Sequence, residues 1–231
     1  GVADLVLLDD NFETLVEAIH EGRGILANIR KAIVYLGSTV LDEVLVIGGA
    51  LVMGLALPLN ALQILWVNFF TDSFPGIAFA FEPRRDFGKK PMDLSRGVFT
   101  PQMKSLLLIN GLIGGILILI LYALLLRFGV EESLSRTVTY AAFASYSLFL
   151  AFAVRSLKQS IIRYNPFSNM IMNFSVLFGL SMLALSIYLP VLQDFFSTTA
   201  LSFFWVCVVL AFGLLNIVII ELTKHIFTEK D

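Results

Sequence analysis

The chain of 231 residues is 58% hydrophobic and only 15% charged, and its mean hydropathy is +0.85. Soluble domains carry about 25% charged residues, so this composition excludes an ordinary soluble protein and indicates a membrane protein. The net charge of −2 and the lack of a basic stripe give no evidence of nucleic-acid binding, so no nucleic-acid partner is expected, and the single cysteine, Cys207, cannot form an internal disulfide.

The first thirty or so residues differ from the rest of the chain. The string VADLVLL at residues 2–8 is typical of a short buried strand, which we expect near residues 4–8. Asp10 and Glu13 approximate a helix-capping box, so a stalk helix should follow and lead into the first apolar stretch. About 30 residues cannot bury a core of their own. With neither an initiator methionine nor a signal peptide, the chain is expected to be the C-terminal piece of a longer protein.

Six apolar stretches follow, each close to the roughly 20 residues that a helix needs to cross a bilayer. The expected spans are residues 33–56, 60–81, 104–127, 137–157, 168–189 and 200–222. The link between the first two is so short that these helices should form an antiparallel hairpin. The expected fold is an all-α membrane protein, a six-helix bundle with the short strand and the stalk helix at its N-terminus.

Basic residues give the orientation of this bundle. Of the 16 Lys and Arg residues, only Arg127 and Arg136 fall on the side opposite to the two termini. The positive-inside tendency therefore places both termini in the cytoplasm. We expect a multi-pass protein of the cell membrane, embedded in the lipid bilayer. The basic loop at residues 82–103 is interpreted as an orientation signal, with lipid-headgroup binding or docking as the alternative.

Three carboxylates lie inside the first two spans, namely Asp42, Glu43 and Asp72. A charged side chain inside a span costs at least ~2.5 to 3.5 kcal/mol, so such residues normally face the bundle interior and pair with a cation or a polar group. Thr39 lies four residues before Glu43, so the two stack on one helix face. These residues indicate a buried cation site.

The second span adds further oxygen atoms to this site. Asn68 and Asp72 lie one helical turn apart with Thr71 beside them, and Pro75 cannot donate to the carbonyl of Thr71. Freed carbonyls at membrane depth are tolerated where they line a cavity or coordinate an ion. Asn68 and Thr71 could instead join helices by hydrogen bonds. For Asp42, a ligand role and a solvated position are equally open.

A set made only of oxygen atoms suits hard cations. Calcium takes six to eight oxygen ligands in a flexible geometry, whereas zinc and copper prefer nitrogen or sulfur. The residues therefore predict a hard cation such as calcium, with sodium, potassium and a proton left open.

Two strings carry a resemblance to a known family. The chain reads NIRK at residues 28–31 and WVNFFTD at residues 66–72, the latter followed by Pro75. Over residues 3–83 it resembles the C-terminal third of a P-type cation-transporting ATPase of the calcium-pump branch. Beyond residue 83, only the number and spacing of spans agree with that family.

The resemblance implies that residues 1–31 finish the cytoplasmic phosphorylation domain and its stalk, and that residues 32–231 are the fifth to tenth membrane helices. It implies Glu43, Asn68, Thr71 and Asp72 as metal ligands, with Asp42 and Thr39 as further candidates. The partners would be the upstream nucleotide-binding, phosphorylation and actuator domains and the first four membrane helices. Those domains would bind ATP and Mg²⁺, so this piece alone should be inactive, with no catalytic residue of its own.

Two departures from the family pattern concern the number of ions. Two-ion calcium pumps resemble S-S-N-x-x-E in the fifth helix, but this chain has Val40 where the amide would be. The stretch Ala144 to Ala153 also lacks the acid that those pumps carry. The sequence therefore predicts one complete divalent site.

Two other classes of protein fit the buried carboxylates. One is an ion-coupled secondary transporter or channel, although the six spans show no inverted repeat. The other is a non-transporting membrane subunit that uses its polar groups for assembly. The leading hypothesis is the membrane part of an ATP-driven calcium pump.

Overall fold

The computed structural model describes residues 12–83, 99–157 and 159–228, and within these ranges the chain forms helices and no strand. Six of the helical segments are long and apolar enough to cross a membrane. The predicted all-α bundle with six spans is therefore confirmed. The strand expected near residues 4–8 lies outside the described residues.

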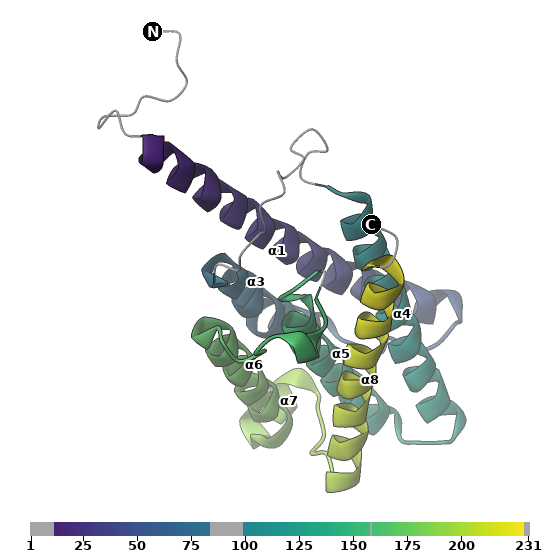
Figure 1. The fold of residues 1–231 in the computed structure, drawn as a ribbon. Coiled ribbons are helices and arrows are strands. Elements are labelled where there is room, and N and C mark those ends of the chain that lie inside the picture. The colour runs from purple at the N-terminus through teal and green to yellow at the C-terminus, as the bar shows by residue number, and fades with distance from the viewer. Residues whose placement is uncertain (1–11, 84–98, 158, 229–231) are drawn as a thin grey trace, which may run out of the picture.

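The first helix, α1 (Phe12–Val52), is a continuous rod of 41 residues. At 1.5 Å per residue it is about 60 Å long, roughly twice the hydrocarbon thickness of a bilayer. Figure 1 shows its N-terminal part projecting beyond the bundle. The helix expected before the first span and the first span itself are thus one helix. Gly54 ends the rod with a φ of +67°, a left-handed conformation that glycine adopts without strain.

The second span is divided into four short helical pieces. They are α2 (Ala61–Trp66), the π-helix η1 (Val67–Ser73), α3 (Phe74–Ala78) and the 3₁₀-helix η2 (Phe79–Phe81). The span begins at a capping box, in which Asn60 Oδ1 accepts from the N–H of Gln63 and Gln63 Oε1 accepts from the N–H of Asn60. The second span therefore begins as a capped α-helix, and the π-helix interrupts it after Trp66.

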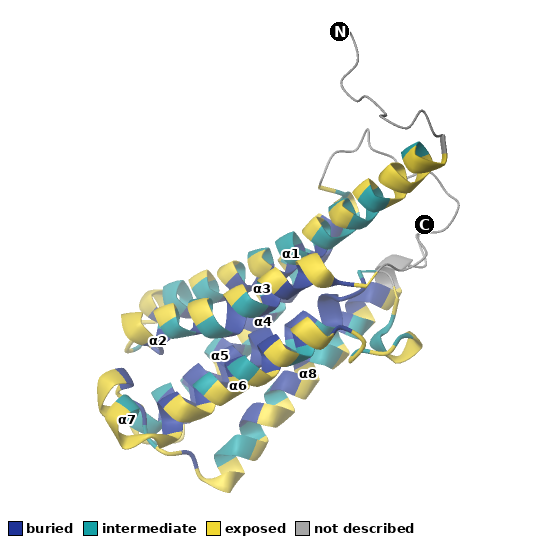
Figure 2. Cartoon of the chain, turned by 90° about the vertical axis from the view of Figure 1, so that its left-hand side faces the viewer, coloured by how far each residue is buried: buried dark blue, intermediate teal, exposed yellow. Residues whose placement is uncertain are grey.

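Four further spans complete the bundle around a central helix. They are α4 (Pro101–Arg127), α5 (Glu132–Val154), α6 (Met170–Tyr188) and α8 (Phe203–Thr228), with η4 (Ile161–Arg163) and α7 (Pro190–Phe196) in the connections. Within an apolar stretch of 18 residues in each helix, 89% of the residues are buried in α5 and 22% are buried in α8. Figure 2 shows this burial as the dark blue of α5. Its many Ala and Ser residues let neighbouring helices approach closely.

The helices α1 and α4 approach each other at two glycines of α4. A Cβ added to Gly111 would lie 2.9 Å from the carbonyl oxygen of Ser38, and one added to Gly115 would lie 3.0 Å from the Cα of Asp42. Small residues at such positions allow backbones of membrane helices to pack against each other. The helix α4 therefore covers the face of α1 that carries Ser38 and Asp42.

A buried ion pair ties four segments together at the end of the bundle from which α1 projects. Arg155 Nη2 lies 2.8 Å from Glu82 Oε1, and both side chains are fully buried. The amide of Asn169 donates to the same carboxylate at 3.0 Å, and the amide of Asn28 donates to the backbone carbonyl of Glu82 at 3.3 Å. The end of the second span is thus held to α1, α5 and the start of α6.

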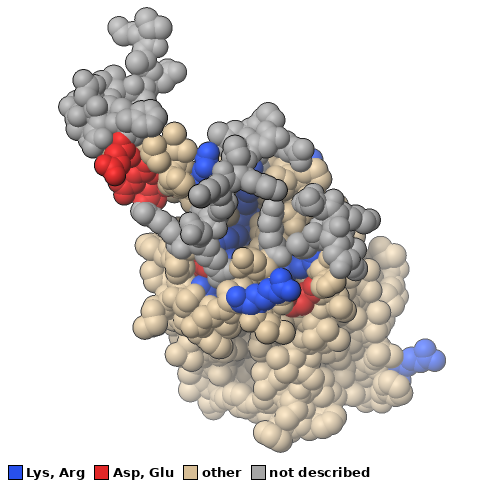
Figure 3. Space-filling view, viewed as in Figure 1, with Lys and Arg blue, Asp and Glu red and all other residues tan. Residues whose placement is uncertain are grey.

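Charged side chains gather at this same end. Figure 3 shows Lys, Arg, Asp and Glu mainly toward the end from which α1 projects, while most of the remaining face is uncharged. An uncharged belt of this kind is what a lipid environment requires.

Candidate cation site

The π-helix η1 and Pro75 leave backbone carbonyls of the second span without their usual donors. Pro75 cannot supply the N–H that the carbonyl of Thr71 would receive in an α-helix. Tyr35 Oη of α1 supplies a donor instead, at 2.8 Å from the Thr71 carbonyl oxygen. Ser73 Oγ donates to the carbonyl of Asn68 at 2.7 Å. The break predicted from Pro75 is present, but the Thr71 carbonyl is satisfied by Tyr35 rather than open to an ion.

Glu43 and Asn68 join the first two spans at the site. Asn68 Nδ2 donates to Glu43 Oε2 at 3.1 Å. Both side chains are half-buried. The amide nitrogen faces the carboxylate, so the amide oxygen of Asn68 is left for another partner. This pair is the direct contact that the short hairpin between the two spans predicts.

Asp72 lies deeper than this pair, with 4% of its surface exposed. Thr71 Oγ1 is 3.3 Å from Asp72 Oδ1 and also donates to the carbonyl of Val67 at 2.9 Å. The hydroxyls of Thr39 and Ser147 lie close enough to interact electrostatically with the Asp72 carboxylate. Hydroxyls from α1, α5 and the second span therefore surround this acid.

Asp42 makes no hydrogen bond with this group, and its backbone lies against Gly115 of α4. Its side chain is fully buried, and neither carboxylate oxygen has a hydrogen-bond partner. The solvated position that the sequence left open for Asp42 is therefore excluded. Its charge interacts with those of Asp72 and Glu43, so the three acids share one electrostatic environment.

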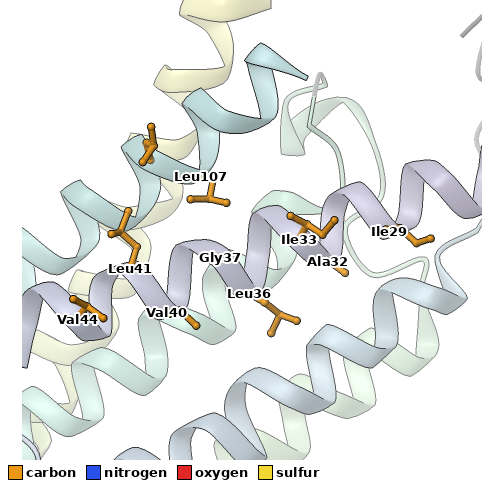
Figure 4. A pocket seen from close by; sticks show the side chains of 10 residues that line it. Ile29, Ala32, Ile33, Leu36, Gly37, Val40, Leu41, Val44 and Leu107 are labelled. Atoms are coloured by element: carbon orange, nitrogen blue, oxygen red, sulfur yellow. The ribbon is translucent and has the colours of Figure 1, made fainter. Parts of the chain in front are cut away.

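Val40, which replaces an amide of the two-ion pattern, points into an apolar groove. Its exposed fraction is 59%, and the groove along α1 has a volume of about 700 Å³. Figure 4 shows Leu36 and Val40 lining this groove from α1. Val40 thus contributes no oxygen to the site, as the sequence indicates.

The arrangement can hold a hard cation only with help from neutral oxygens. Among the described residues, no three His, Cys, Asp or Glu side chains are placed to hold a metal ion together. The candidate ligands form two groups, Glu43 with Asn68 and Asp72 with Thr71 and Thr39. Calcium needs six to eight oxygens, so further donors must complete its shell.

Sequence reasoning missed two polar residues next to these ligands and a buried amide of α4. They are Tyr35, which satisfies the Thr71 carbonyl, Ser147, which lies beside Asp72, and Asn110 of α4, which is 2% exposed. The signal for Asn110 was available, because a lone amide in the apolar stretch of α4 is costly unless it faces the bundle interior. Tyr and Ser give no such signal, because both are frequent in membrane helices.

Comparisons with known proteins point to one family. The family model described as "Cation transporting ATPase, C-terminus" matches residues 56–226. A calcium-transporting ATPase of Bacillus subtilis (strain 168) is 35% identical over 203 residues, which are 87% of this chain and 23% of that protein.

A fungal and a human protein show similar sequence identity and coverage. Calcium-transporting ATPase 1 of Yarrowia lipolytica is 33% identical over 204 residues, covering 87% of this chain and 22% of that protein. Calcium-transporting ATPase type 2C member 1 of Homo sapiens is 30% identical over 231 residues, covering 99% of this chain and 25% of that protein. The chain thus spans about a quarter of the length of these relatives.

Proposed function

The chain belongs to the cation-transporting ATPases, and on that premise we propose that it is the C-terminal membrane part of an ATP-driven calcium pump. The observation that carries this proposal is the contact of Glu43 with Asn68, one helical turn from the buried Asp72. Oxygen ligands at a helix break suit a hard cation. The three relatives named above are all called calcium-transporting, which favours calcium over sodium, potassium or a proton.

The ion site is proposed to consist of Glu43, Asn68, Thr71 and Asp72, with Thr39 beside them. Glu43 and Asp72 supply charge, and Asn68 supplies its amide oxygen. The hydroxyls of Thr71 and Thr39 hold the Asp72 carboxylate in place. The remaining ligands would come from membrane helices encoded upstream of this chain.

Movement is proposed to reach the site through α1. Residues 1–31 would finish the phosphorylation domain and its stalk, and ATP and Mg²⁺ would bind to domains upstream. Because α1 is one helix from Phe12 to Val52, a displacement of its projecting end also displaces Glu43. Asn28 and Tyr35 of the same helix bind both ends of the region that contains Asp72. Rigid coupling of this kind would switch the site between the two sides of the membrane.

In the proposed orientation both termini lie in the cytoplasm, and Arg127 and Arg136 lie on the outer side of the cell membrane. It is supported by the basic residues, because Lys and Arg are enriched in cytoplasmic loops. A reporter fused within residues 82–103 should accordingly be found inside the cell. A reporter found outside would reverse the orientation.

The test is transport by the full-length protein in sealed vesicles. ATP should drive uptake of isotopic calcium, and uptake should persist when sodium, potassium and proton gradients are collapsed. Uptake that needs an ion gradient and ignores ATP would identify a secondary transporter. Uptake of another cation in preference to calcium would correct the proposed cargo.

A further inference from the structure

The end of the second span at Glu82 is held by two sets of contacts of unequal strength. The stronger set comes from α5 and the start of α6. The carboxylate of Glu82 accepts hydrogen bonds from Arg155 Nε and Nη2 at 2.8 to 3.1 Å and from the amide of Asn169 at 3.0 Å. The Asn169 amide also donates to the backbone carbonyl of Ala78 at 3.1 Å. Hydrogen bonds with an ionised partner are roughly twice as strong as neutral ones, so these contacts anchor Glu82 firmly.

The weaker contact comes from α1. The amide of Asn28 donates to the backbone carbonyl of Glu82 at 3.3 Å, and both groups are neutral. Lys31, one turn further along α1, donates from Nζ to Asn28 Oδ1 at 3.0 Å. This contact points the amide nitrogen of Asn28 toward Glu82, and the ammonium charge on the amide oxygen strengthens the amide as a donor. Lys31 is 7% exposed, so the orienting contact is largely shielded from water.

The bond from Asn28 belongs to a row of three hydrogen bonds between α1 and the second span. The second bond runs from Tyr35 to the carbonyl of Thr71. The third runs from Asn68 to Glu43. Asn28, Tyr35 and Glu43 are seven and eight residues apart, about two helical turns each, so they lie on one side of α1. Because α1 is one continuous helix, the bond at Asn28 favours the position of α1 at which the other two bonds form.

The third bond of this row pairs two proposed cation ligands with each other. Asn68 presents its amide nitrogen to the Glu43 carboxylate, and this nitrogen is a hydrogen-bond donor that cannot coordinate a cation. A hard cation held by both residues needs the amide oxygen and a carboxylate oxygen turned toward it, so the bond between Asn68 and Glu43 has to break. The position of α1 that the three bonds stabilise is therefore the one that suits an empty site.

We propose that Asn28, oriented by Lys31, is an autoinhibitory latch, which holds α1 against the end of the second span in the cation-free form of the protein and opens when a cation binds. The proposal rests on the proposed function, because it requires a cation to bind at the proposed ion site. The neutral bond from Asn28 is the one that opens, because the charged contacts keep Glu82 on α5 and α6.

The latch lowers the affinity for the cation without contacting it. A site whose binding-competent form is populated only in part binds its ligand with an apparent affinity reduced by that fraction. Each bond that stabilises the cation-free form reduces this fraction further. Loss of the bond from Asn28 should therefore raise the apparent affinity, which is the opposite of what the loss of a ligand does.

The test compares two phosphorylation reactions of the full-length protein. Phosphorylation by ATP at increasing calcium reports the cation-bound form, and phosphorylation by inorganic phosphate without calcium reports the cation-free form. Asn28→Leu removes the bond to Glu82, and Asn28→Asp removes the donor but keeps a partner for Lys31. In both variants the calcium concentration for half-maximal phosphorylation should fall about three- to tenfold, as expected for the loss of one hydrogen bond. Inorganic phosphate should be needed at a correspondingly higher concentration.

The opposite signs of the two shifts make the result specific, because a damaged fold would weaken both reactions. Lys31→Met removes the orienting charge and should shift both reactions in the same directions as Asn28→Leu, but by less. Gln102→Leu is the matched control. The amide of Gln102 also donates to a backbone carbonyl at this end of the bundle, that of Leu157 at 3.4 Å, but it joins α4 to the segment after α5. This control should shift neither reaction.

The outcomes separate the latch from the proposed function. If Asn28→Leu does not fold, Asn28→Asp and Lys31→Met decide the question. An unchanged or lowered calcium affinity in the Asn28 variants, or an equal gain in Gln102→Leu, would overturn the latch and leave the calcium site in place. A wild-type protein whose phosphorylation by ATP ignores calcium would overturn the proposed function instead. The reaction with inorganic phosphate then decides on the latch, because it needs no calcium: a higher phosphate requirement in the Asn28 variants supports it, and an unchanged one overturns it.

Discussion

The hydroxyl of Tyr35 and the backbone carbonyl of Thr71 form a 2.8 Å hydrogen bond between the first two spans. The bond takes the place of the donor that Pro75 lacks, so it stabilises the helix break beside Asp72. Both residues are fully buried. The geometry of the candidate site therefore depends on a residue that is not a ligand.

Replacing Tyr35 with Phe should weaken both the fold and cation binding. A buried carbonyl left without a donor costs about 1 to 3 kcal/mol, so the thermal unfolding temperature of the full-length protein should fall. The apparent affinity for calcium should fall with it, because the break next to Asp72 loses its support. Calcium-dependent phosphorylation by ATP measures that affinity.

The matched control is Tyr188→Phe. Tyr188 also donates to a backbone carbonyl, that of Leu201, at 2.9 Å, but it lies in α6 away from the candidate ligands. This variant should lose stability without a change in calcium affinity. Equal losses of affinity in the two variants would contradict a specific role for Tyr35.

Asp72→Asn should abolish calcium-dependent phosphorylation by ATP in the full-length protein. The substitution removes the buried charge of the proposed site, while the reverse reaction with inorganic phosphate, which needs an empty site, should persist. Asp194→Asn, in the exposed part of α7, serves as the control and should behave as wild type. A wild-type response to calcium in Asp72→Asn would remove this residue from the site.

Glu43 and Asn68 should be energetically coupled, because their side chains are in direct contact at 3.1 Å. Glu43→Ala and Asn68→Ala should each lower the apparent calcium affinity by about tenfold or more, which corresponds to about 1.4 kcal/mol. Residues that act as one unit give non-additive effects, so the double variant should lose much less than the sum. Strict additivity would show that the two residues act at separate places.

How much of this site the sequence predicts depends on distance along the chain. The spans that contain Glu43 and Asn68 are joined by a short hairpin, so their contact follows from hydropathy and loop length alone. The placement of the acids is also predictable, because a charge inside a span must avoid lipid.

Contacts between spans that are far apart in the sequence cannot be predicted in this way. Glu82 and Arg155 are 73 positions apart, and nothing in the local pattern of either residue indicates the other. The sequence suggests a role in orientation for Arg155 as one basic residue among many, yet its guanidinium is fully buried. Ser147 likewise reaches Asp72 only because α5 packs against η1 of the second span. Helix periodicity shows on which face of its helix a residue lies, but it does not show which other helix packs against that face.

Breaking the Glu82–Arg155 pair should destabilise the protein strongly. Arg155→Met removes the positive charge that pairs with the buried carboxylate of Glu82, and breaking a buried ion pair costs about 3 to 5 kcal/mol. The double variant Arg155→Met with Glu82→Leu should recover much of that loss, because apolar replacements of both partners are often tolerated.

An exposed pair provides the comparison. Arg136 and Glu132 are 2.6 Å apart in successive turns of α5, with side-chain exposures of 37% and 55%. Removing either one should cost about 0.3 to 0.5 kcal/mol. Thermal unfolding in detergent measures all four variants. Similar losses for the buried and the exposed pair would contradict the anchoring role given to Arg155.

Gly115→Ala should push α4 away from α1, whereas Gly48→Ala should be tolerated. A Cβ at Gly115 would lie 2.8 Å from the Cβ of Leu45 and 3.0 Å from the backbone of Asp42, so one helix must move. Overpacking of this kind costs about 1 to 3 kcal/mol. A Cβ at Gly48 meets nothing within 4 Å, and alanine is a better helix former by about 1 kcal/mol. The unfolding temperature should therefore fall for Gly115→Ala and stay level or rise for Gly48→Ala. The opposite order would show that α1 and α4 do not pack in the way described.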